Sequence, residues 1–183
     1  DKCATLITRN GKRVKSEGVT LPSGETMKDI DEEGYKYLGV LQNENLMNRE
    51  MKDKVRDEYF RRVKLLAKSK LYARNLIAGI NAWAIGVVRY SAGIIDWTKL
   101  DLKGMDVKTR KILTMHGVFK RTSGVGRLYL KRKEGGRGLI SVSDCVACEK
   151  RNLSEYVGSS SEWMLKVVKE DGLTSETESK KEY

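Results

Sequence analysis

Apolar residues change their spacing along this chain, and the change falls near residue 45. Before that point, β-branched and aromatic residues form short runs at 3–9 and 35–41. Turn signals separate these runs: Asn10-Gly11, Pro22-Ser23-Gly24 and Glu32-Glu33-Gly34. The pattern predicts a small antiparallel sheet over 1–45, with a strand at 35–41 that has a glycine where something approaches closely.

From residue 46 the apolar residues recur every three or four positions, which is the helical period. One such stripe predicts a long helix that ends near Tyr72: Met47, Met51, Val55, Tyr59, Val63 and Leu66. Residues 75–90 are almost continuously apolar, which predicts a buried helix with a face of small residues for close packing.

Thr98 and Asp101 form a capping-box pattern for a third helix, which Gly117 can end. Shorter helices are expected at 144–157 and 163–168. The fold class that we expect is therefore α+β, a small antiparallel sheet followed by a helical bundle.

The net charge is large, positive and unevenly distributed. The 183 residues include 36 Lys and Arg against 25 Asp and Glu, a net charge of +11. Residues 170–183 carry five acids and two bases, so residues 1–169 hold a charge of +14. A field of this sign favours nucleic acid as a partner. The acidic tail is expected to be disordered.

Other sequence features bear on compartment and completeness. The sequence has no apolar run long enough to span a bilayer and no signal-peptide pattern, so we expect no membrane partner and a cytoplasmic or nuclear protein. Cys3, Cys145 and Cys148 form no paired framework, which fits a reducing compartment. Because the first residue is Asp1 rather than Met, we expect a fragment of a longer protein.

The segment 125–142 combines positive charge with glycine. Its basic run is interrupted by Gly135-Gly136-Arg137-Gly138 and gives way to apolar Leu139-Ile140. Glycine allows positive φ and a close approach of backbone to a polyanion, while Lys and Arg supply phosphate contacts. We interpret the segment as an ordered loop that binds a nucleic-acid backbone; the alternative is a flexible basic loop or a nuclear-targeting patch.

Three stretches occur in an informative order: Asp1-Lys2-Cys3, Tyr35-Lys36-Tyr37-Leu38-Gly39-Val40, and Leu128-Tyr129-Leu130 with Gly135-Gly136-Arg137-Gly138-Leu139. Together with 80–97 and 109–117, they resemble the reverse transcriptases of non-LTR (LINE-type) retrotransposons over residues 1–156. The resemblance implies the C-terminal part of a polymerase palm at 1–45 and a helical thumb-like domain at 46–117. The basic Gly-rich loop and post-thumb helices would occupy 118–169, before the acidic tail at 170–183.

The resemblance also implies roles for individual residues. Lys2 would match the lysine of the fourth polymerase motif, a candidate proton donor to the leaving pyrophosphate. The turn Tyr37-Leu38-Gly39 would match the primer grip, where glycine lets a hairpin touch the primer backbone. The template–primer duplex would lie along a basic helix face and the basic loop, made of Arg56, Arg61, Lys64, Lys68, Lys131, Arg132, Lys133, Gly135, Gly136 and Arg137.

The chain departs from the family pattern where catalysis is concerned. Polymerisation in this family needs palm carboxylates that hold two Mg²⁺ ions, usually in an aromatic-x-Asp-Asp turn, and the sequence has no such turn. Lys131 stands where relatives tend to carry proline, and there is no Cys/His knuckle. We therefore expect no cofactor in this chain, Mg²⁺ in the full-length parent enzyme, and no polymerisation by the chain alone. The missing palm and fingers of the parent would be its protein partners.

Simpler interpretations exist for several of these residues. Tyr35 and Tyr37 could merely pack on one face of a sheet, and the long helix could be a solvated amphipathic helix. The acidic run 29–33 is most simply a solvated loop. Trp83, Trp97 and Trp163 are expected as core or interface anchors, His116 as a helix cap, and Cys145 with Cys148 as structural thiols rather than a zinc site.

Three functions remain open at this stage. The first is a fragment of an RNA-directed DNA polymerase that binds its template–primer duplex without the metal site. The second is a non-catalytic basic nucleic-acid-binding module or transposon relic. The third is a helical protein-interaction module, which would use Trp83 and the small-residue helix face.

Overall fold

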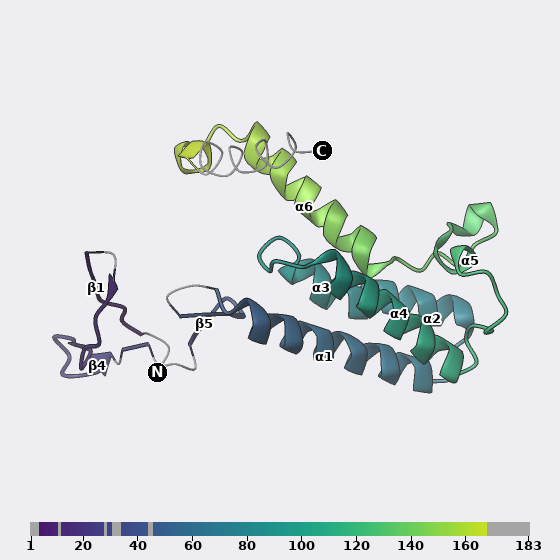
Figure 1. The fold of residues 1–183 in the computed structure, drawn as a ribbon, viewed down its shortest axis with the longest axis horizontal. Helices are drawn as coiled ribbons and strands as arrows, with labels where there is room; N and C mark the ends of the chain where they lie inside the picture. Colours follow the sequence, from purple (N-terminus) through teal and green to yellow (C-terminus); the bar gives the residue numbers. More distant parts are fainter. Residues whose placement is uncertain (1–3, 11, 28, 31–33, 44–45, 168–183) are drawn as a thin grey trace. The chain divides into compact units, whose positions relative to one another are not determined.

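A computed structural model of the chain describes residues 4–10, 12–27, 29–30, 34–43 and 46–167. It has the expected α+β class, with short antiparallel strand pairs followed by helices (Figure 1). The chain divides into two compact units, Asp1–Val55 and Arg56–Tyr183. The boundary lies inside the first long helix, and each unit is described separately below.

The first unit contains three two-stranded antiparallel ladders. Strand β1 (Thr8–Arg9) pairs with β2 (Lys12–Arg13), β3 (Val19–Thr20) with β4 (Thr26–Met27), and β5 (Tyr35–Tyr37) with β6 (Val40–Gln42). The antiparallel pairing is as predicted, but the described strands form three separate sheets rather than one. Asn10 has the positive φ expected of its hairpin turn, at 51°, whereas Gly11 lies outside the described residues.

The strand predicted at 35–41 is wrong, because this segment is a hairpin. Leu38 and Gly39 adopt φ values of 47° and 83°, and positive φ at two successive residues reverses the chain tightly. Tyr37 pairs with Val40 across this turn. Glycine tolerates the left-handed conformation, but a leucine there is strained by roughly 1–2 kcal/mol.

The helical part begins with α1 (Asn48–Lys68), four residues shorter at its end than predicted. The apolar segment that follows is one helical path of three parts: α2 (Ala73–Gly79), the π-helical turn η1 (Ile80–Ala84) and α3 (Ile85–Ser91). Its small face is only partly a packing surface, since Gly79 meets Leu66 while Ala78 and Ala82 are exposed. The predicted burial of this helix is therefore confirmed for one side only.

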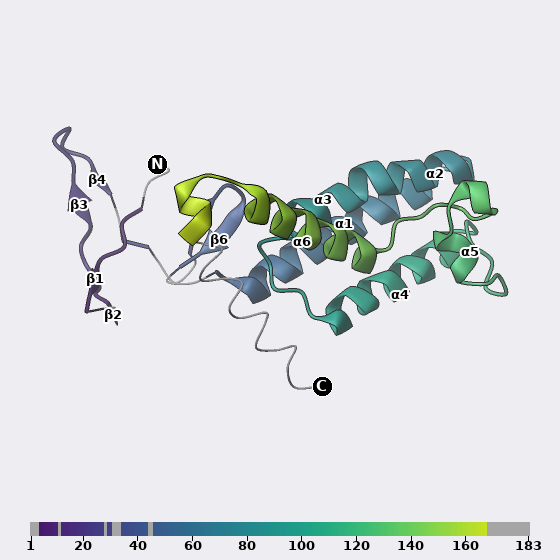
Figure 2. The same ribbon diagram turned by 90° about the horizontal axis from the view of Figure 1, so that it is seen from above.

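The next helix, α4 (Lys99–Met115), has the capping box predicted from the sequence. The Thr98 hydroxyl accepts from the Asp101 amide at 3.1 Å, and Gly117, at φ 70°, follows the helix end. Two short turns, α5 (Gly126–Tyr129) and η2 (Arg132–Glu134), precede α6 (Val142–Ser159), and residues 163–167 form a further helical turn. Helix α6 packs against α3 and α4 (Figure 2).

The core of the second unit is apolar, with a few polar ties. Val63, Ile80, Ile85, Val88, Leu113 and Leu128 have no exposed surface. Inside this core, the Tyr59 hydroxyl lies 3.0 Å from that of Thr109. Asp106 of α4 accepts hydrogen bonds from the Val142 amide at 2.8 Å and the Ser143 hydroxyl at 2.9 Å, and so caps α6 from a neighbouring helix.

Candidate nucleic-acid interface

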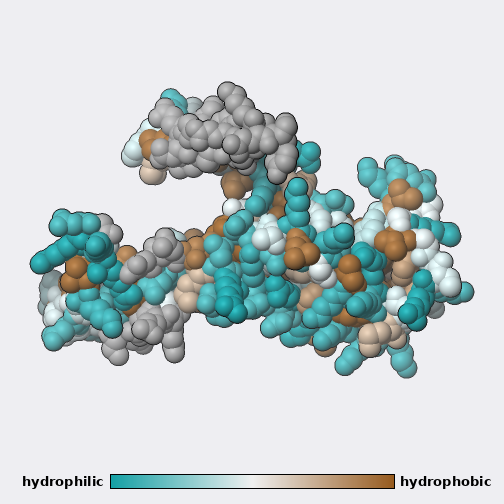
Figure 3. Space-filling view, in the orientation of Figure 1, coloured by the Kyte–Doolittle hydropathy of each residue, from teal (hydrophilic) through white to brown (hydrophobic). Residues whose placement is uncertain are grey.

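The exposed surface of α1 in the second unit carries most of the basic residues that the sequence singles out. Hydrophilic residues cover most of the surface drawn over this helix (Figure 3). A hollow of about 290 Å³ lies between α1 and α4 and is lined by Asp57, Phe60, Arg61, Lys64, Leu65, Lys68 and Lys108. Four of these side chains are cationic and one is acidic, so the hollow has a positive potential.

Lys108 extends this surface beyond α1. Its ammonium group lies 4.3 Å from the centre of the Phe60 ring, a cation–π contact that holds a helix α4 charge beside the α1 charges. Sequence reasoning missed Lys108, because no local pattern distinguishes it from the other lysines of α4. Once it is known that α1 and α4 are neighbours, the helical period does put Lys108 on the side of α4 that faces Phe60.

The cations on α1 are not equally available. Glu58 binds Arg61 through both carboxylate oxygens, at 2.7 and 2.8 Å, and binds Arg62 at 2.7 Å. Hydrogen bonds from Arg61 and then Arg62 lower the pKa of Glu58 to about 2. Glu58 is therefore ionised at neutral pH and offsets part of the charge of both arginines.

Arg62 and Arg56 have further partners. The Arg62 guanidinium lies 5.0 Å from the centre of the Trp83 ring and donates to the Trp83 carbonyl at 2.8 Å. Arg56 lies 3.8 Å from Asp101 on α4. Arg61, Lys64 and Lys68 are the exposed cations of the α1 set that line a hollow, and of these Arg61 is paired with Glu58. Lys68 also lines a second hollow.

The second hollow joins the end of α1 to the Gly-rich loop. It measures about 550 Å³ and is lined by Ala67, Lys68, Lys70, Leu71, Ala73, Leu76, His116, Gly117, Val118 and Arg137. Arg137 donates from Nη1 to the Val118 carbonyl at 2.8 Å. Lys68 and Arg137, predicted separately from two distant stretches of sequence, therefore lie at one site.

The Gly-rich loop is held by hydrogen bonds, and its amides serve the fold. The amides of Gly136, Gly138 and Leu139 donate to the carbonyls of Lys131, Leu130 and Leu128, at 3.0, 2.9 and 3.0 Å. A Cβ on Gly136 would overlap the Leu130 carbonyl oxygen. The sequence analysis predicted that the loop backbone would contact a polyanion. These amides instead donate to carbonyls within the fold.

The loop instead offers side chains. Lys131, Arg132 and Lys133 are exposed where the chain passes through η2, and Gly135 ends that turn at φ 77°. Arg127 donates to the Gly135 carbonyl at 3.4 Å. The predicted cations are thus displayed by a loop whose backbone shape does not depend on a ligand.

Asn81 fixes this loop to the helical core. Its side-chain amide donates to the Gly138 carbonyl at 2.8 Å, and its side-chain oxygen accepts from the Ile140 amide at 3.0 Å. Asn81 lies in the π-helical turn η1, and such turns are frequent at functional positions. No sequence signal identified Asn81, since a lone asparagine in an apolar helix is uninformative without the loop that it binds.

In the first unit, the predicted primer-contact residues lie at a hairpin tip. Tyr37 is 56% exposed and Leu38 is 69% exposed, and Gly39 completes the turn. These side chains are available to a ligand of this unit. Lys2 lies outside the described residues.

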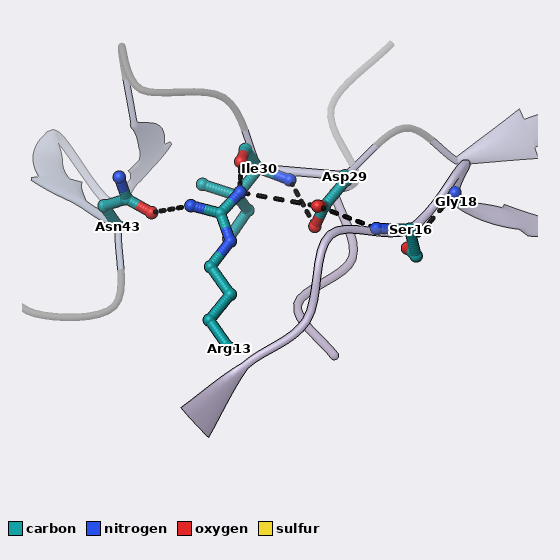
Figure 4. Close-up of polar contacts among 6 residues, drawn as sticks. All are labelled: Arg13, Ser16, Gly18, Asp29, Ile30 and Asn43. Atoms are coloured by element: carbon teal, nitrogen blue, oxygen red, sulfur yellow. Dashed lines mark hydrogen bonds and ion pairs between the residues drawn. The ribbon is translucent and has the colours of Figure 1, made fainter. Parts of the chain in front are cut away.

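A polar cluster holds the first unit's hairpins together (Figure 4). Arg13 donates to the Ile30 carbonyl, to Asn43 Oδ1 at 3.0 Å and to Asp29 Oδ2 at 3.4 Å. Burial raises the pKa of Asp29, but the Ser16 amide and the Arg13 guanidinium outweigh it, so the pKa lies below its ordinary value. Asp29 is thus part of this cluster rather than of a simple solvated loop; Asp31, Glu32 and Glu33 lie outside the described residues.

The remaining predicted residues have mostly structural surroundings. Trp97 is buried as expected, whereas Trp83 and Trp163 are 40% and 72% exposed. His116 ends α4, as predicted. Cys145 is buried, which raises the pKa of its thiol, and Cys148 is half-buried one turn further along α6.

No protein-family model matches the chain, and neither a curated protein nor a solved structure is similar enough to it to count as a match. Within the described ranges, no helix is long and apolar enough to cross a membrane. The same residues contain no group of three or more His, Cys, Asp or Glu placed to hold a metal ion. The functional assignment therefore depends on the residues and the geometry given above.

Proposed function

We propose that this chain is a fragment of an RNA-directed DNA polymerase of the non-LTR retrotransposon type and that it binds the template–primer duplex through the duplex backbone. The observation that carries the proposal is the meeting of Lys68 and Arg137 at one basic surface. Two stretches that the family resemblance assigns to one ligand, the thumb helix and the Gly-rich loop, supply one side chain each. Phosphate contacts of this kind give affinity without sequence specificity.

Two local geometries support the family resemblance. The segment 35–42 is a tight hairpin with a glycine in its turn, which is the form expected of a primer grip. Lys131, which replaces a proline common among relatives, has a φ of −59° and a ψ of 152° and follows Leu130 at ψ 144°. Both conformations are those that a proline at 131 requires.

The proposal includes chemistry that belongs to the parent enzyme. Mg²⁺ and the metal-binding carboxylates would come from the palm of that enzyme, and Lys2 would assist the leaving pyrophosphate. The fragment would contribute duplex binding and Lys2, without the metal site.

The test is binding of a fluorescent RNA/DNA hybrid by the whole chain, followed by anisotropy between 50 and 200 mM salt. We expect a preference for the hybrid over a single strand of equal length and a steep loss of affinity with salt. Each lost phosphate contact should lower the log–log salt slope by about 0.9. Charge reversal of Lys131, Arg132 and Lys133 should weaken hybrid binding, while reversal of Lys99 and Lys103, exposed on α4 outside both linings, should weaken it less. Unchanged affinity of the loop variant at low salt would refute a role for the loop.

A second function is favoured by one observation. Ala78 and Ala82 are exposed and Trp83 is 40% exposed, so part of the small-residue helix face is available to a protein partner. A protein-interaction module would bind its partner with little salt dependence and would show no hybrid affinity. The same titration therefore separates the two functions.

A further inference from the structure

The hollow between the end of α1 and the Gly-rich loop differs from the α1–α4 hollow in the charge of its lining. Three of its lining residues are cationic, Lys68, Lys70 and Arg137, His116 adds an imidazole, and none is acidic. They come from three stretches of chain: the end of α1 and its following turn, the end of α4, and the loop. Independent segments therefore converge on one small volume with one sign of charge.

The position of Arg137 is set before any ligand arrives. Its Nη1 donates to the Val118 carbonyl, and its own amide donates to the Arg127 carbonyl at 2.9 Å. A guanidinium held at one nitrogen keeps its other donors in a fixed plane, the arrangement that pairs with two oxygens of one phosphate. The conformational entropy of this side chain is therefore lost on folding rather than on ligand binding.

Lys70 is the second unusual feature. It has a φ of 53°, a left-handed conformation that a lysine adopts at a cost, and it is exposed between α1 and α2. Residues held in such conformations gather at ligand sites. The turn at Lys70 and the turn at Gly117, φ 70°, both border the hollow.

Helix-end capping accounts for only part of this arrangement. Lys68 lies at the C-terminal end of α1, where positive charge compensates for the helix dipole, and His116 is the residue that ends α4. Arg137 ends no helix, and Lys70 lies beyond α1 in the strained turn. The fold therefore brings more positive charge to the hollow than the end of α1 uses.

From this geometry we infer that the hollow is a binding site for a phosphomonoester dianion. A backbone phosphodiester carries one charge and lies along a strand, whereas a terminal phosphate carries nearly two and projects into a recess. The volume of about 550 Å³ holds the phosphate with an attached sugar. The phosphate could belong to a free nucleotide or to the 5′ end of a nucleic acid. The inference goes beyond the proposed function, because it requires neither a polymerase parent nor a duplex.

The first experiment is a titration of the full chain with uridine 5′-monophosphate, with uridine as the uncharged comparison. Binding is followed through the amide NMR signals of Gly117 and Val118 and through calorimetry. We expect saturable binding of the monophosphate and none of uridine. Lys70→Gln and His116→Gln, both at exposed positions, should each weaken binding by about tenfold. Lys103→Gln and Lys111→Gln, exposed on α4 outside the lining, serve as matched controls and should leave it unchanged.

The second experiment separates the two sources of phosphate. RNA/DNA hybrids with a 5′-phosphate or a 5′-hydroxyl are compared by anisotropy, in the original chain and in Lys70→Gln. A gain from the 5′-phosphate that Lys70→Gln removes identifies a nucleic-acid end, and monophosphate binding without that gain identifies a free nucleotide. Either result supports the inference.

Other results would overturn it. Absence of saturable monophosphate binding together with equal affinity for the two hybrids would do so, as would equal losses in the lining and control variants. Failure of the duplex proposal is distinguishable, since it would appear as weak, salt-insensitive binding of both hybrids while the monophosphate titration still reports on the hollow.

Discussion

The hairpins before residue 44 and the helices after Arg56 are stabilised by different kinds of contact. None of the described side chains before Met51 is fully buried, and the hairpins share one polar cluster around Arg13 and Asp29. The helical unit instead buries an apolar core from α1 to α6. A core distributes stability over many small contacts, whereas a cluster concentrates it in a few groups.

This difference decides what a substitution of a charged residue measures in each unit. In the helical unit the apolar core carries the fold, so variants of exposed lysines such as Lys64 and Lys133 test binding first, whereas Arg62 and Arg137 also bond within the fold. In the hairpin unit, Arg13 and Asp29 are charges that the fold itself uses. A variant there tests stability before it tests function.

The largest effect is expected from a cavity in the helical core. Leu113 has no exposed surface, and Leu113→Ala should lower the free energy of unfolding of this unit by about 3 kcal/mol, through lost apolar transfer and the residual cavity. Leu100→Ala on the same helix, at a side chain that is 80% exposed, is the matched control and should change it by less than about 0.5 kcal/mol. Denaturant unfolding followed by circular dichroism measures both. Equal effects would mean that α4 does not contribute its buried face to a core.

A smaller loss is expected in the Gly-rich loop. Gly136→Ala places a Cβ against the Leu130 carbonyl, and relieving that overlap should cost about 1–3 kcal/mol and break the loop hydrogen bonds. Faster hydrogen exchange at Gly138 and Leu139 would report the change. Gly124→Ala, at a position with open space, is the control, and protection of both amides in the Gly136 variant would contradict the close approach.

A gain is expected at the hairpin tip. Leu38→Asn replaces a strained left-handed leucine by a residue that tolerates this conformation, and should stabilise the hairpin by about 1 kcal/mol. Slower exchange of the amides of β5 and β6, with no change in α4, would confirm that the gain is local. If the exchange rates stay unchanged, the turn does not hold Leu38 at positive φ.

The smallest effect is expected when the hairpin unit is acidified. Because the pKa of Asp29 is lowered in the folded chain, its ionised form contributes stability above the ordinary value of 3.8, and this contribution is lost as the pH falls through the folded value. The amides of Ser16 and Ile30, both bonded to this carboxylate, should lose protection at the acid end of a titration from pH 7 to pH 3. Asp29→Asn should show weaker protection at neutral pH and little further change on acidification.

Local chemistry made several elements predictable from sequence. The Thr98–Asp101 cap and the glycine after α4 are readable because each requires only residues close in sequence. The stripe through Met51, Val55, Tyr59 and Val63 predicted the buried side of α1 for the same reason. The hairpin at 35–42 was missed in the periodicity analysis, because a leucine at positive φ contradicts its propensity.

Individual basic residues of the candidate site could be predicted from the sequence. Which of them the fold brings together could not. Lys68 and Arg137 could each be singled out, but their common hollow depends on how α1, α4 and the loop pack. His116, Lys70 and Lys108 join the basic surface only through that packing, and the Asn81 clamp spans 57 residues to Gly138. Long-range contacts of this kind leave no mark on local sequence patterns.

The Gly-rich loop has a consequence for molecular evolution. Gly135 and Gly138 are demanded by backbone conformation and Gly136 by crowding, so selection for folding alone would preserve all three. Arg137, between them, meets no such backbone demand, and the fold uses its side chain only for the bond to the Val118 carbonyl. Among descendants of this sequence, drift at 137 beside constant glycines would mark a lineage that kept the fold and lost the ligand. Retention of arginine there would mark one that still binds it.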